Sequence, residues 1–186
     1  MISRTILPIA LQGDVVSGTD QFSLGDTAHS LFFSPKAPVD GFILGAGPVF
    51  LIPTATDSAL GGEKWGAGRT GAILRQSGPW TYGALANHIW SFAGDSSRRD
   101  VSTAFLQPFL SYTTPKVTTY ALNLESTYDW KRDDWAVPVN FQVNQLFDVS
   151  GQKMQFGGGV RYWLDSAKGG PDGFGGRVNL VFLFPK

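Results

Sequence analysis

The sequence predicts an all-β fold: an antiparallel, up-and-down transmembrane β-barrel with about ten strands in this chain. Three observations predict it. Apolar and polar residues alternate along most of the chain. Long charged connections alternate with short turns, and the tryptophans stand beside the connections. A length of 186 residues suits one domain, which we place at 1–186.

The strongest alternation lies in residues 117–144, where two arms flank the charged turn 131–134. The first arm alternates an apolar with a polar set: Tyr120, Leu122 and Leu124 against Asn123, Glu125 and Asp129. The second arm does the same: Val139, Phe141 and Val143 against Asn140, Gln142 and Asn144. Period two is the pattern of a strand with one apolar and one polar face. Each arm exceeds the common strand of about 5–6 residues and is closer to the roughly 9–11 residues that cross a bilayer.

The same pattern predicts the other strands in chain order. The full set is 2–12, 22–34, 41–53, 65–76, 79–93, 101–114, 117–130, 135–148, 154–165 and 173–184. In the last of these, Val178 and Leu180 alternate with Arg177 and Asn179. The faces of 22–34 and 79–93 are ambiguous, so these two segments receive no inside or outside assignment.

Glycines and prolines inside the segments carry further information. Glycines recur at alternate positions, at 45 and 47, 66 and 68, and 157 and 159. This spacing disfavours a helix and suits the crowded inner face of a curved sheet. Prolines 8, 48, 108 and 138 also fall inside segments. Because a proline cannot donate to the ladder, we expect a β-bulge at some of these positions.

The connections alternate in length and charge. The segments 13–21, 54–64, 94–100 and 166–172 are long and charged, whereas 77–78 and 115–116 are minimal turns. An up-and-down barrel shows this alternation when one rim carries outer loops and the other carries tight turns. A soluble sandwich has no reason to alternate in this way.

Aromatic residues at the strand ends predict two interfacial girdles. Those beside the odd-numbered, charged connections are Trp65, Trp90, Trp130, Trp135 and Trp163, and those beside an even-numbered connection are Trp80 and Tyr82. The alternative is that the tryptophans anchor the core of a soluble fold. Core anchors would scatter along the middle of the strands, so the positions favour the girdles.

The composition excludes several classes of protein. Lys plus Arg and Asp plus Glu number 15 each, so no basic excess favours nucleic acid as a partner. The chain has no cysteine, hence no disulfide framework or thiolate metal site. No apolar run approaches the about 18 residues of a membrane helix. The start MISRTILPIA does not read as a signal peptide, so we expect that a leader was removed or that the chain is a fragment.

Several stretches together resemble one known family. They are ISRTILPI (2–9), LFFSPK (31–36), GPVFLIPTATD (47–57), GPWTYGALANHIWSFAGD (78–95), FLQPFLSYTTP (105–115), ESTYDW (125–130), GGGVRYW (157–163) and FLFPK (182–186). The family is that of bacterial outer-membrane β-barrels labelled as transporters, or as phenol meta-pathway degradation-like and neuromedin-U-like proteins. The resemblance implies the outer membrane of a Gram-negative bacterium, and it supplies no catalytic residues. It also implies about two further strands before Met1, giving a family barrel of about twelve strands.

If the polar faces point inward, they supply a set of lumen residues. These are Arg4, Arg69, Arg75, Asn123, Glu125, Asp129, Asn140, Gln142, Asn144, Arg161, Arg177 and Asn179. Mixed arginines and carboxylates in a narrow barrel either form a charge network that props the interior or line a permeation path. The network is the commoner arrangement.

The sequence gives little support to catalysis or metal binding. The only histidines are His29 and His88, and period two turns each away from its serine neighbour in HisSer or AsnHisIleTrpSer. Glu125 and Asp129 share a strand face and could form a catalytic carboxylate pair. Carboxylates inside a barrel more commonly pair with cations. We therefore predict no catalytic residues, no cofactor and no metal.

The predicted function is a porin-like channel that passes or binds small solutes, aromatic or hydrophobic ones among them, through a polar lumen. Its partners are the lipid bilayer, the outer-membrane assembly machinery and the solute. One alternative is a soluble antiparallel β-barrel that binds a hydrophobic ligand inside, and another is a plugged structural barrel without transport. The direction of the apolar face separates the soluble alternative from the membrane prediction, because a soluble barrel hides that face.

Overall fold

The structure is a computed structural model that describes residues 1–16, 19–57 and 61–183. Its strands are β1 (Ile2–Ile6), β2 (Ile9–Val16), β3 (Thr19–Leu24), β4 (Thr27–Phe32), β5 (Ile43–Ile52), β6 (Lys64–Ser77), β7 (Trp80–Gly94), β8 (Ser102–Thr113), β9 (Thr118–Leu124), β10 (Ser126–Asp129), β11 (Asp134–Ala136), β12 (Pro138–Val149), β13 (Gln152–Trp163) and β14 (Phe174–Leu183). Within the described ranges there is no helix that could cross a membrane.

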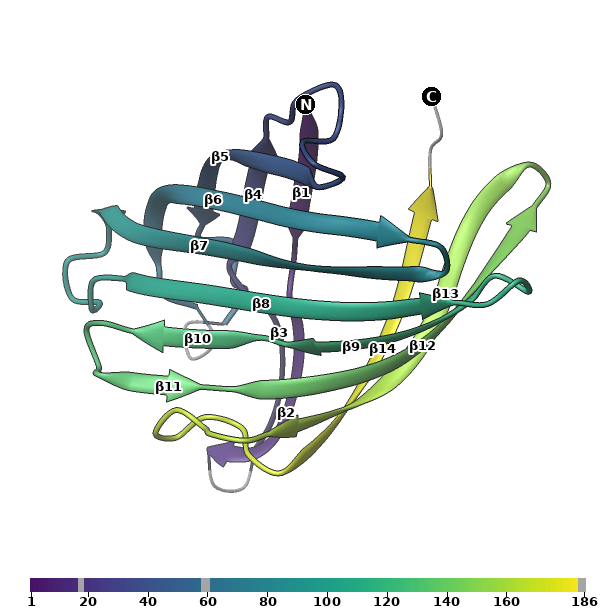
Figure 1. The fold of residues 1–186 in the computed structure, drawn as a ribbon. Coiled ribbons are helices and arrows are strands. Elements are labelled where there is room, and N and C mark those ends of the chain that lie inside the picture. The colour runs from purple at the N-terminus through teal and green to yellow at the C-terminus, as the bar shows by residue number, and fades with distance from the viewer. Residues whose placement is uncertain (17–18, 58–60, 184–186) are drawn as a thin grey trace.

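The all-β antiparallel prediction is confirmed. Twelve strands form one sheet in the order β1-β4-β5-β6-β7-β8-β9-β12-β13-β14, with β10 and β11 continuing β9 and β12. All of its ladders are antiparallel, and from β4 to β9 each strand pairs with the next along the chain. β9 then pairs with β12, β10 pairs with β8 and β11, and β12, β13 and β14 pair in turn. Figure 1 shows this sheet curled into a half-barrel, with the hairpin of β2 and β3 extending beyond β1 and β4. The ten predicted segments match these strands, four of them being divided in two. The predicted long connection 13–21 is wrong, because β2 extends to Val16 and β3 begins at Thr19.

The sheet has two open edges. In the described part of the chain, β1 pairs only with β4 and β14 pairs only with β13. The predicted closed ring is therefore an open half-barrel here, with a hollow concave face and an outer convex face (Figure 1). Sequence alternation reports the faces of a strand but not the curvature that would bring its first and last strands together.

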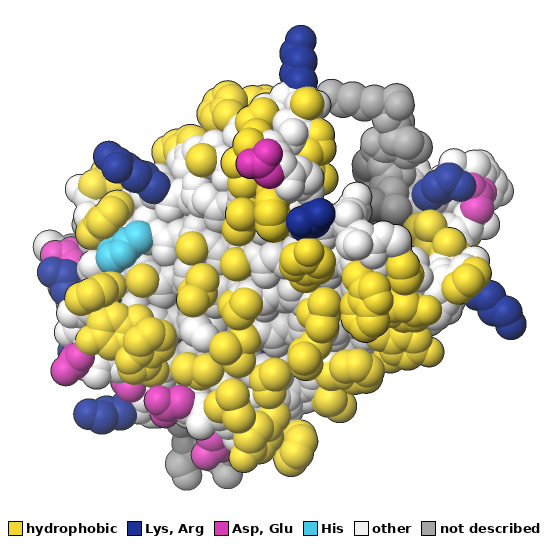
Figure 2. Space-filling view, viewed as in Figure 1, with side chains coloured by type: hydrophobic (Ala, Val, Ile, Leu, Met, Phe, Trp, Pro, Cys, Tyr) yellow, Lys and Arg dark blue, Asp and Glu magenta, His cyan; other side chains and the backbone are white. Residues whose placement is uncertain are grey.

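Burial along β12 identifies what each face carries. Asn140, Gln142 and Asn144 are buried, whereas Phe141 and Val143 between them are exposed. Cross-strand partners share a face, so the ladders extend this sorting from strand to strand. Figure 2 shows the convex face, where hydrophobic side chains spread over the strands and charged side chains gather mainly near the strand ends. The predicted apolar-outside, polar-inside arrangement of this arm is confirmed.

The alternate glycines lie on the concave face, as predicted. The ladders place Gly68 opposite the buried Val49, and Gly157 opposite Asn144. A Cβ on Gly159 would stand 2.1 Å from the carbonyl oxygen of Phe141, and one on Gly157 would stand 1.9 Å from Asn144 Oδ1. Neighbouring strands thus approach so closely on the inner side that no side chain fits there.

The prolines interrupt ladders instead of producing bulges. Pro8 separates β1 from β2, and Pro138 begins β12 directly after the break that ends β11. The ladder of β8 with β9 ends at Phe109, and that with β10 resumes at Leu106, so the gap spans Pro108. A missing N–H removes one rung and leaves the register unchanged on both sides. The bulge in the described part of the main sheet lies instead between Trp65 and Gly66.

The long loops meet at one rim, as the alternating connection lengths predict. Lys64 Nζ lies 3.1 Å from Asp100, and Arg98 lies 3.2 Å from Glu63, so the β5–β6 and β7–β8 loops are tied together. The hydrogen bond from Lys64 lowers the pKa of Asp100. The tight turns after β6, β8 and β12 lie at the opposite rim (Figure 1).

Candidate functional site on the concave face

Glu125 stands at the break between β9 and β10. Its backbone N–H donates to the carbonyl of Pro138 at 2.9 Å, on one side, while the interrupted ladder at Pro108 lies on the other. The side chain of Gln107 donates to Glu125 Oε1 at 3.2 Å. The Glu125 side chain is only 15% exposed, so its carboxylate needs partners that compensate for lost hydration.

Two arginines supply those partners. Arg177 Nη1 donates to Glu125 Oε1 at 2.7 Å, and Arg161 Nη2 contacts Oε2. Arg161 lies on β13 and Arg177 on β14, whereas Glu125 follows β9. In the sheet, β12 and β13 lie between β9 and β14. The side chains of Glu125 and Arg177 can therefore meet only across the concave face.

Neutral amides surround this ion triad. Arg161 Nε donates to Asn140 Oδ1 at 2.6 Å, and Asn140 Nδ2 donates to Asn123 Oδ1 at 2.9 Å. A second amide pair joins Asn179 Nδ2 to Asn144 Oδ1 at 2.8 Å. Among the described residues, Asn179 Oδ1 is a buried acceptor without a donor. The amides therefore fix the arginine orientations and add hydrogen-bonding capacity but no charge.

Arg4 approaches the triad from the first strand. It pairs with Ser30 in the β1–β4 ladder, and Ser30 pairs with Val49, both buried on the concave side. Arg4 is half-buried and within electrostatic range of Glu125 and Arg177. No hydrogen bond or ion pair joins its guanidinium to the described residues. We call Arg4, Arg161 and Arg177 the arginine cluster: Arg161 and Arg177 contact Glu125, and Arg4 interacts with it electrostatically.

The concave face changes character between its two halves. The half formed by β9 to β14 carries the amides together with Arg161 and Arg177. The half formed by β4 to β7 carries the buried apolar residues Phe32, Val49, Leu85 and Ile89. Arg4, opposite Ser30 in the ladder, lies on β1 at the open edge of the sheet, beside the apolar half.

Ten of the twelve predicted lumen residues lie on the concave face. They are Arg4, Asn123, Glu125, Asp129, Asn140, Gln142, Asn144, Arg161, Arg177 and Asn179. Gln107 belongs with them and was missed. Alternation along β8 could have identified it, because Gln107 lies between the exposed Leu106 and the outward-facing Pro108.

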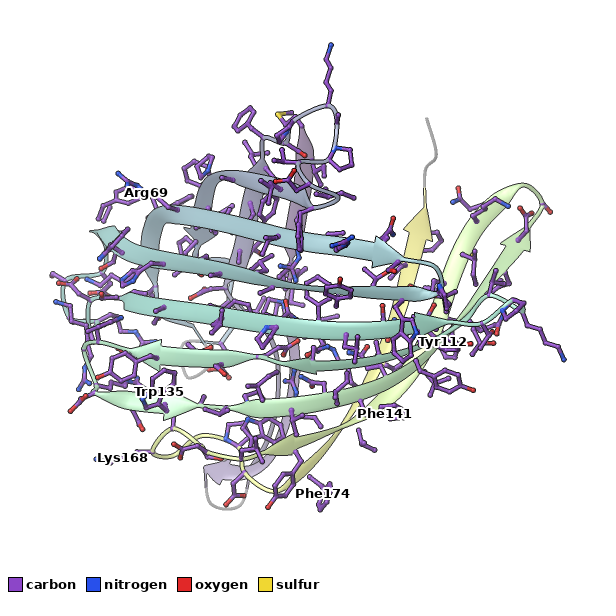
Figure 3. All side chains as sticks on the ribbon, viewed as in Figure 1. Arg69, Tyr112, Trp135, Phe141, Lys168 and Phe174 are labelled. Atoms are coloured by element: carbon purple, nitrogen blue, oxygen red, sulfur yellow. The ribbon has the colours of Figure 1, made fainter. Side chains whose placement is uncertain are left out.

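Arg69 and Arg75 were predicted to line the lumen, and the structure places both on the convex face. Arg69 pairs with His88, and Arg75 pairs with the exposed Tyr82. Figure 3 shows Arg69 directed away from the sheet. Arg75 lies over the Phe42 ring at 5.4 Å. The prediction followed the polarity of these residues, whereas their spacing from the exposed Ile73 fixes their face.

Asp129 was also predicted to line the lumen, and the ladders place it on the concave face, opposite Thr103, where it caps the turn after β10. Its Oδ1 accepts from the backbone N–H of Lys131 at 2.8 Å and of Arg132 at 3.2 Å. Asp129 also forms an ion pair with Arg132 at 3.6 Å. An aspartate at the end of a strand satisfies the free N–H groups of the following turn, which alternation does not reveal.

Most of the predicted girdle lies on the convex face. Trp65, Trp90, Trp130 and Trp135 are exposed near the loop rim, and Trp80 and Tyr82 are exposed near the turn rim. His88, which received no face from the sequence, stacks on Trp90 with ring centroids 4.1 Å apart. Tyr128 contacts both Trp130 and Trp135 at 4.8 Å. These contacts form an aromatic band along one end of the sheet.

Trp163 does not belong to this band. It is half-buried on the concave face, and the guanidinium of Arg161 lies 5.4 Å from its ring centre. Trp163 and Arg161 are two residues apart on one strand, so they share a face. The convex position at this end of β13 is taken by Tyr162, which contacts Phe174 at 4.8 Å.

The described residues give little support for metal binding or nucleophilic catalysis. In the described ranges, no group of three or more histidines, cysteines or carboxylates could hold a metal. His88 Nε2 lies 3.2 Å from Ser102 Oγ, but no carboxylate among the described residues bonds the other ring nitrogen. Nucleophilic catalysis uses such an orienting third group.

No family model, curated protein or solved structure matches the chain.

Proposed function

We propose that the chain forms the wall of an outer-membrane β-barrel whose polar concave face passes or binds small solutes. One observation carries the proposal: apolar side chains are exposed on the convex face, while amides are buried and an ion triad is half-buried on the concave face. A membrane-embedded sheet has this polarity because lipid solvates its outside and water its lumen. The aromatic band at the loop rim agrees, since tryptophan and tyrosine favour the membrane interface.

A soluble barrel that binds a hydrophobic ligand is the second candidate. The apolar half of the concave face, with Phe32 and Leu85, favours it. Against it stand the exposed side chains of Phe141 (45%), Val160 (56%) and Val178 (75%) on the convex face of three neighbouring strands. Apolar exposure of this extent marks a surface that meets lipid or another protein.

The test begins with folding of the full chain in detergent micelles and lipid vesicles. We expect a β-rich, protease-resistant species whose gel mobility changes on boiling. Single-channel conductance in a planar bilayer then distinguishes passage from a plugged barrel. A chain that reaches the same β content in buffer without detergent would contradict the membrane assignment and favour the soluble barrel. A heat-modifiable species without conductance would favour a structural barrel.

A further inference from the structure

An apolar groove crosses β5, β6 and β7 on the convex face, the face seen in Figure 2. Its volume of about 490 Å³ lies within the range of ligand pockets. Small residues form its floor, because the ladders place Gly71 opposite both Ala46 and Ala86. Beside the floor stand the side chains of Phe33 and Ile73, which are 59% and 43% exposed. These walls are therefore accessible to a molecule that covers the convex face.

Gly71 keeps the floor hollow although the packing of the strands does not require a glycine there. A Cβ at this position would lie 3.8 Å from the carbonyl oxygen of Gly45, which is an ordinary contact. The inward-facing Gly68 on the same strand differs, since its Cβ would stand 1.7 Å from the carbonyl oxygen of His88. The space above Gly71 is thus a property of the convex surface and not a consequence of close strand approach.

A free guanidinium stands at the end of the groove nearest the loop rim. Arg69 precedes Gly71 by two residues, so it lies on the same face of β6 at about 7 Å along the strand. Its side chain is exposed and points away from the sheet (Figure 3), and no hydrogen bond or ion pair joins it to a described residue. Its ladder partner His88 stacks on Trp90 of the aromatic band. The groove therefore meets the aromatic band at Arg69.

The opposite end of the groove carries an arginine that already has a partner. Arg75 lies two residues beyond Ile73 on the same face of β6, and it pairs with Tyr82 in the ladder. Its guanidinium lies over the Phe42 ring, 5.4 Å from the centroid, where the ring attracts the cation. The two ends of the groove thus differ, and Arg69 is the end whose donors remain available to an external anion.

A cation beside an apolar groove on a lipid-facing surface matches the two parts of a phospholipid. Interfacial aromatic residues lie at the level of the headgroups, and Trp90 places Arg69 next to that level. A charged side chain costs little there and much at the middle of the bilayer. Guanidinium groups bind phosphates through paired N–H donors. A phosphate at Arg69 would let an attached acyl chain run over Gly71 towards the middle of the sheet.

We propose that this groove binds one anionic phospholipid, with its phosphate at Arg69 and one acyl chain against Phe33, Gly71 and Ile73. The proposal rests on the proposed function, because it requires the convex face to meet lipid. It goes beyond that function by assigning a particular lipid to a particular place on the outer surface. A second copy of the chain seated on the groove would cover the apolar residues but would leave Arg69 without an anion.

The test is native mass spectrometry of the full chain, folded in detergent micelles and titrated with three probes. Dimyristoyl phosphatidylglycerol carries both features, dimyristoyl phosphatidylcholine lacks the net negative charge, and glycerol 3-phosphate lacks the acyl chains. We expect the first bound phosphatidylglycerol to bind about fivefold more tightly than phosphatidylcholine, the effect of one arginine near an anionic lipid surface. Glycerol 3-phosphate should not bind at the same concentrations.

A charge variant and its matched control test the phosphate end. R69Q should weaken phosphatidylglycerol binding about fivefold, to the level of phosphatidylcholine. R99Q removes the same charge from an exposed arginine in the β7–β8 loop, and it should leave both affinities unchanged. Both variants keep the fold intact, because neither arginine has a hydrogen bond or ion pair to a described residue.

A filling variant and its matched control test the groove itself. G71L should weaken both lipids about tenfold, the effect of displacing about two methylene groups of the acyl chain. G176L is the control, because Gly176 faces outward opposite Val160 and its Cβ would meet nothing within 4 Å. This control should leave both affinities unchanged. If G71L fails to fold, the comparison of R69Q with R99Q still decides.

Several outcomes would overturn the lipid site. They are equal affinity for the two lipids, equal effects of R69Q and R99Q, equal effects of G71L and G176L, and glycerol 3-phosphate binding as tight as that of phosphatidylglycerol. A dimer mass that G71L converts to a monomer mass would also overturn it, because the occupant would then be a second copy of the chain.

The lipid site and passage fail separately. R69Q and G71L lie on the convex face, so both variants should conduct in a planar bilayer as the unchanged chain does. Phosphatidylglycerol binding that depends on Arg69 in a chain without conductance would remove passage and leave the lipid site standing. Conductance together with equal binding of the two lipids would leave passage standing and remove the lipid site.

Discussion

At the scale of single residues, Glu125 is the position on which the concave network depends. It accepts hydrogen bonds from Gln107 and Arg177 and contacts Arg161. Removing one partner of a buried ion pair leaves the other charges uncompensated, and this costs more than the pair itself contributes. The three arginines would then repel one another across the concave face.

We predict that E125A lowers the free energy of unfolding by about 3 kcal/mol. E125Q should lower it less, because the glutamine keeps the shape and the hydrogen bond to Gln107. Urea unfolding of the micelle-folded chain, followed by tryptophan fluorescence, measures both. D172A is the control, since Asp172 is exposed and should shift the midpoint by no more than about 0.5 kcal/mol. Equal effects of E125A and D172A would contradict this account of the network.

Individual site residues could be predicted where alternation and polarity agree. Asn140, Gln142 and Asn144 face inward on β12 as their spacing indicates. Arg69 could not be placed by its polarity, because its face follows from its spacing in the strand. The convergence of Arg4, Glu125 and Arg177 was beyond the sequence, since three distant strands must first curl toward one another.

At the scale of the elements, close strand approach explains why β13 needs its glycines. Gly159 faces inward, where a Cβ would meet the Phe141 carbonyl oxygen at 2.1 Å and the Gln142 Cα at 2.8 Å. Its neighbour Gly158 faces outward, and its Cβ would stand 3.4 Å from the carbonyl oxygen of Arg177. Adjacent positions of one strand therefore differ sharply in the space they offer.

We predict that G159A destabilises the fold by roughly 1–3 kcal/mol, as overpacking commonly does. G158A is the matched control on the same strand and should change stability by less than about 0.5 kcal/mol. Unfolding midpoints in urea compare the two variants directly. A G159A chain as stable as G158A would show that β12 and β13 do not approach as closely as described.

The breaks within strands are a second feature of the elements. The gap between β9 and β10 lies across from Pro108, and the gap between β11 and β12 precedes Pro138. The strands on both sides of Glu125 are thus interrupted at the same level of the sheet. The sequence indicated that prolines would disturb the ladders, but it could not show that two of them flank one carboxylate, because register is a tertiary property.

At the scale of the whole molecule, the central claim concerns which face of the sheet meets lipid and which meets water. The strands and their order could be predicted from period two and from the connection lengths, which are local signals. The open edges at β1 and β14 could not, because curvature and closure depend on the sum of the twist between strands. In the proposed function, the convex face meets lipid and the concave face meets water.

Spin labels at neighbouring positions of β12 test this claim most directly. The chain has no cysteine, so F141C, Q142C, V143C and N144C each give one labelling site. Phe141 points away from the hollow of the sheet (Figure 3), and Gln142 is buried on the opposite side. With the chain folded in lipid vesicles, accessibility to oxygen and to a water-soluble nickel chelate is measured at each site.

The account predicts high oxygen accessibility at 141 and 143 and low oxygen accessibility at 142 and 144. Oxygen concentrates in the hydrocarbon, so this alternation would place the convex face in lipid. The opposite phase, or nickel accessibility at 141 and 143 equal to that of an exposed loop label, would place the apolar face in water and contradict the membrane assignment.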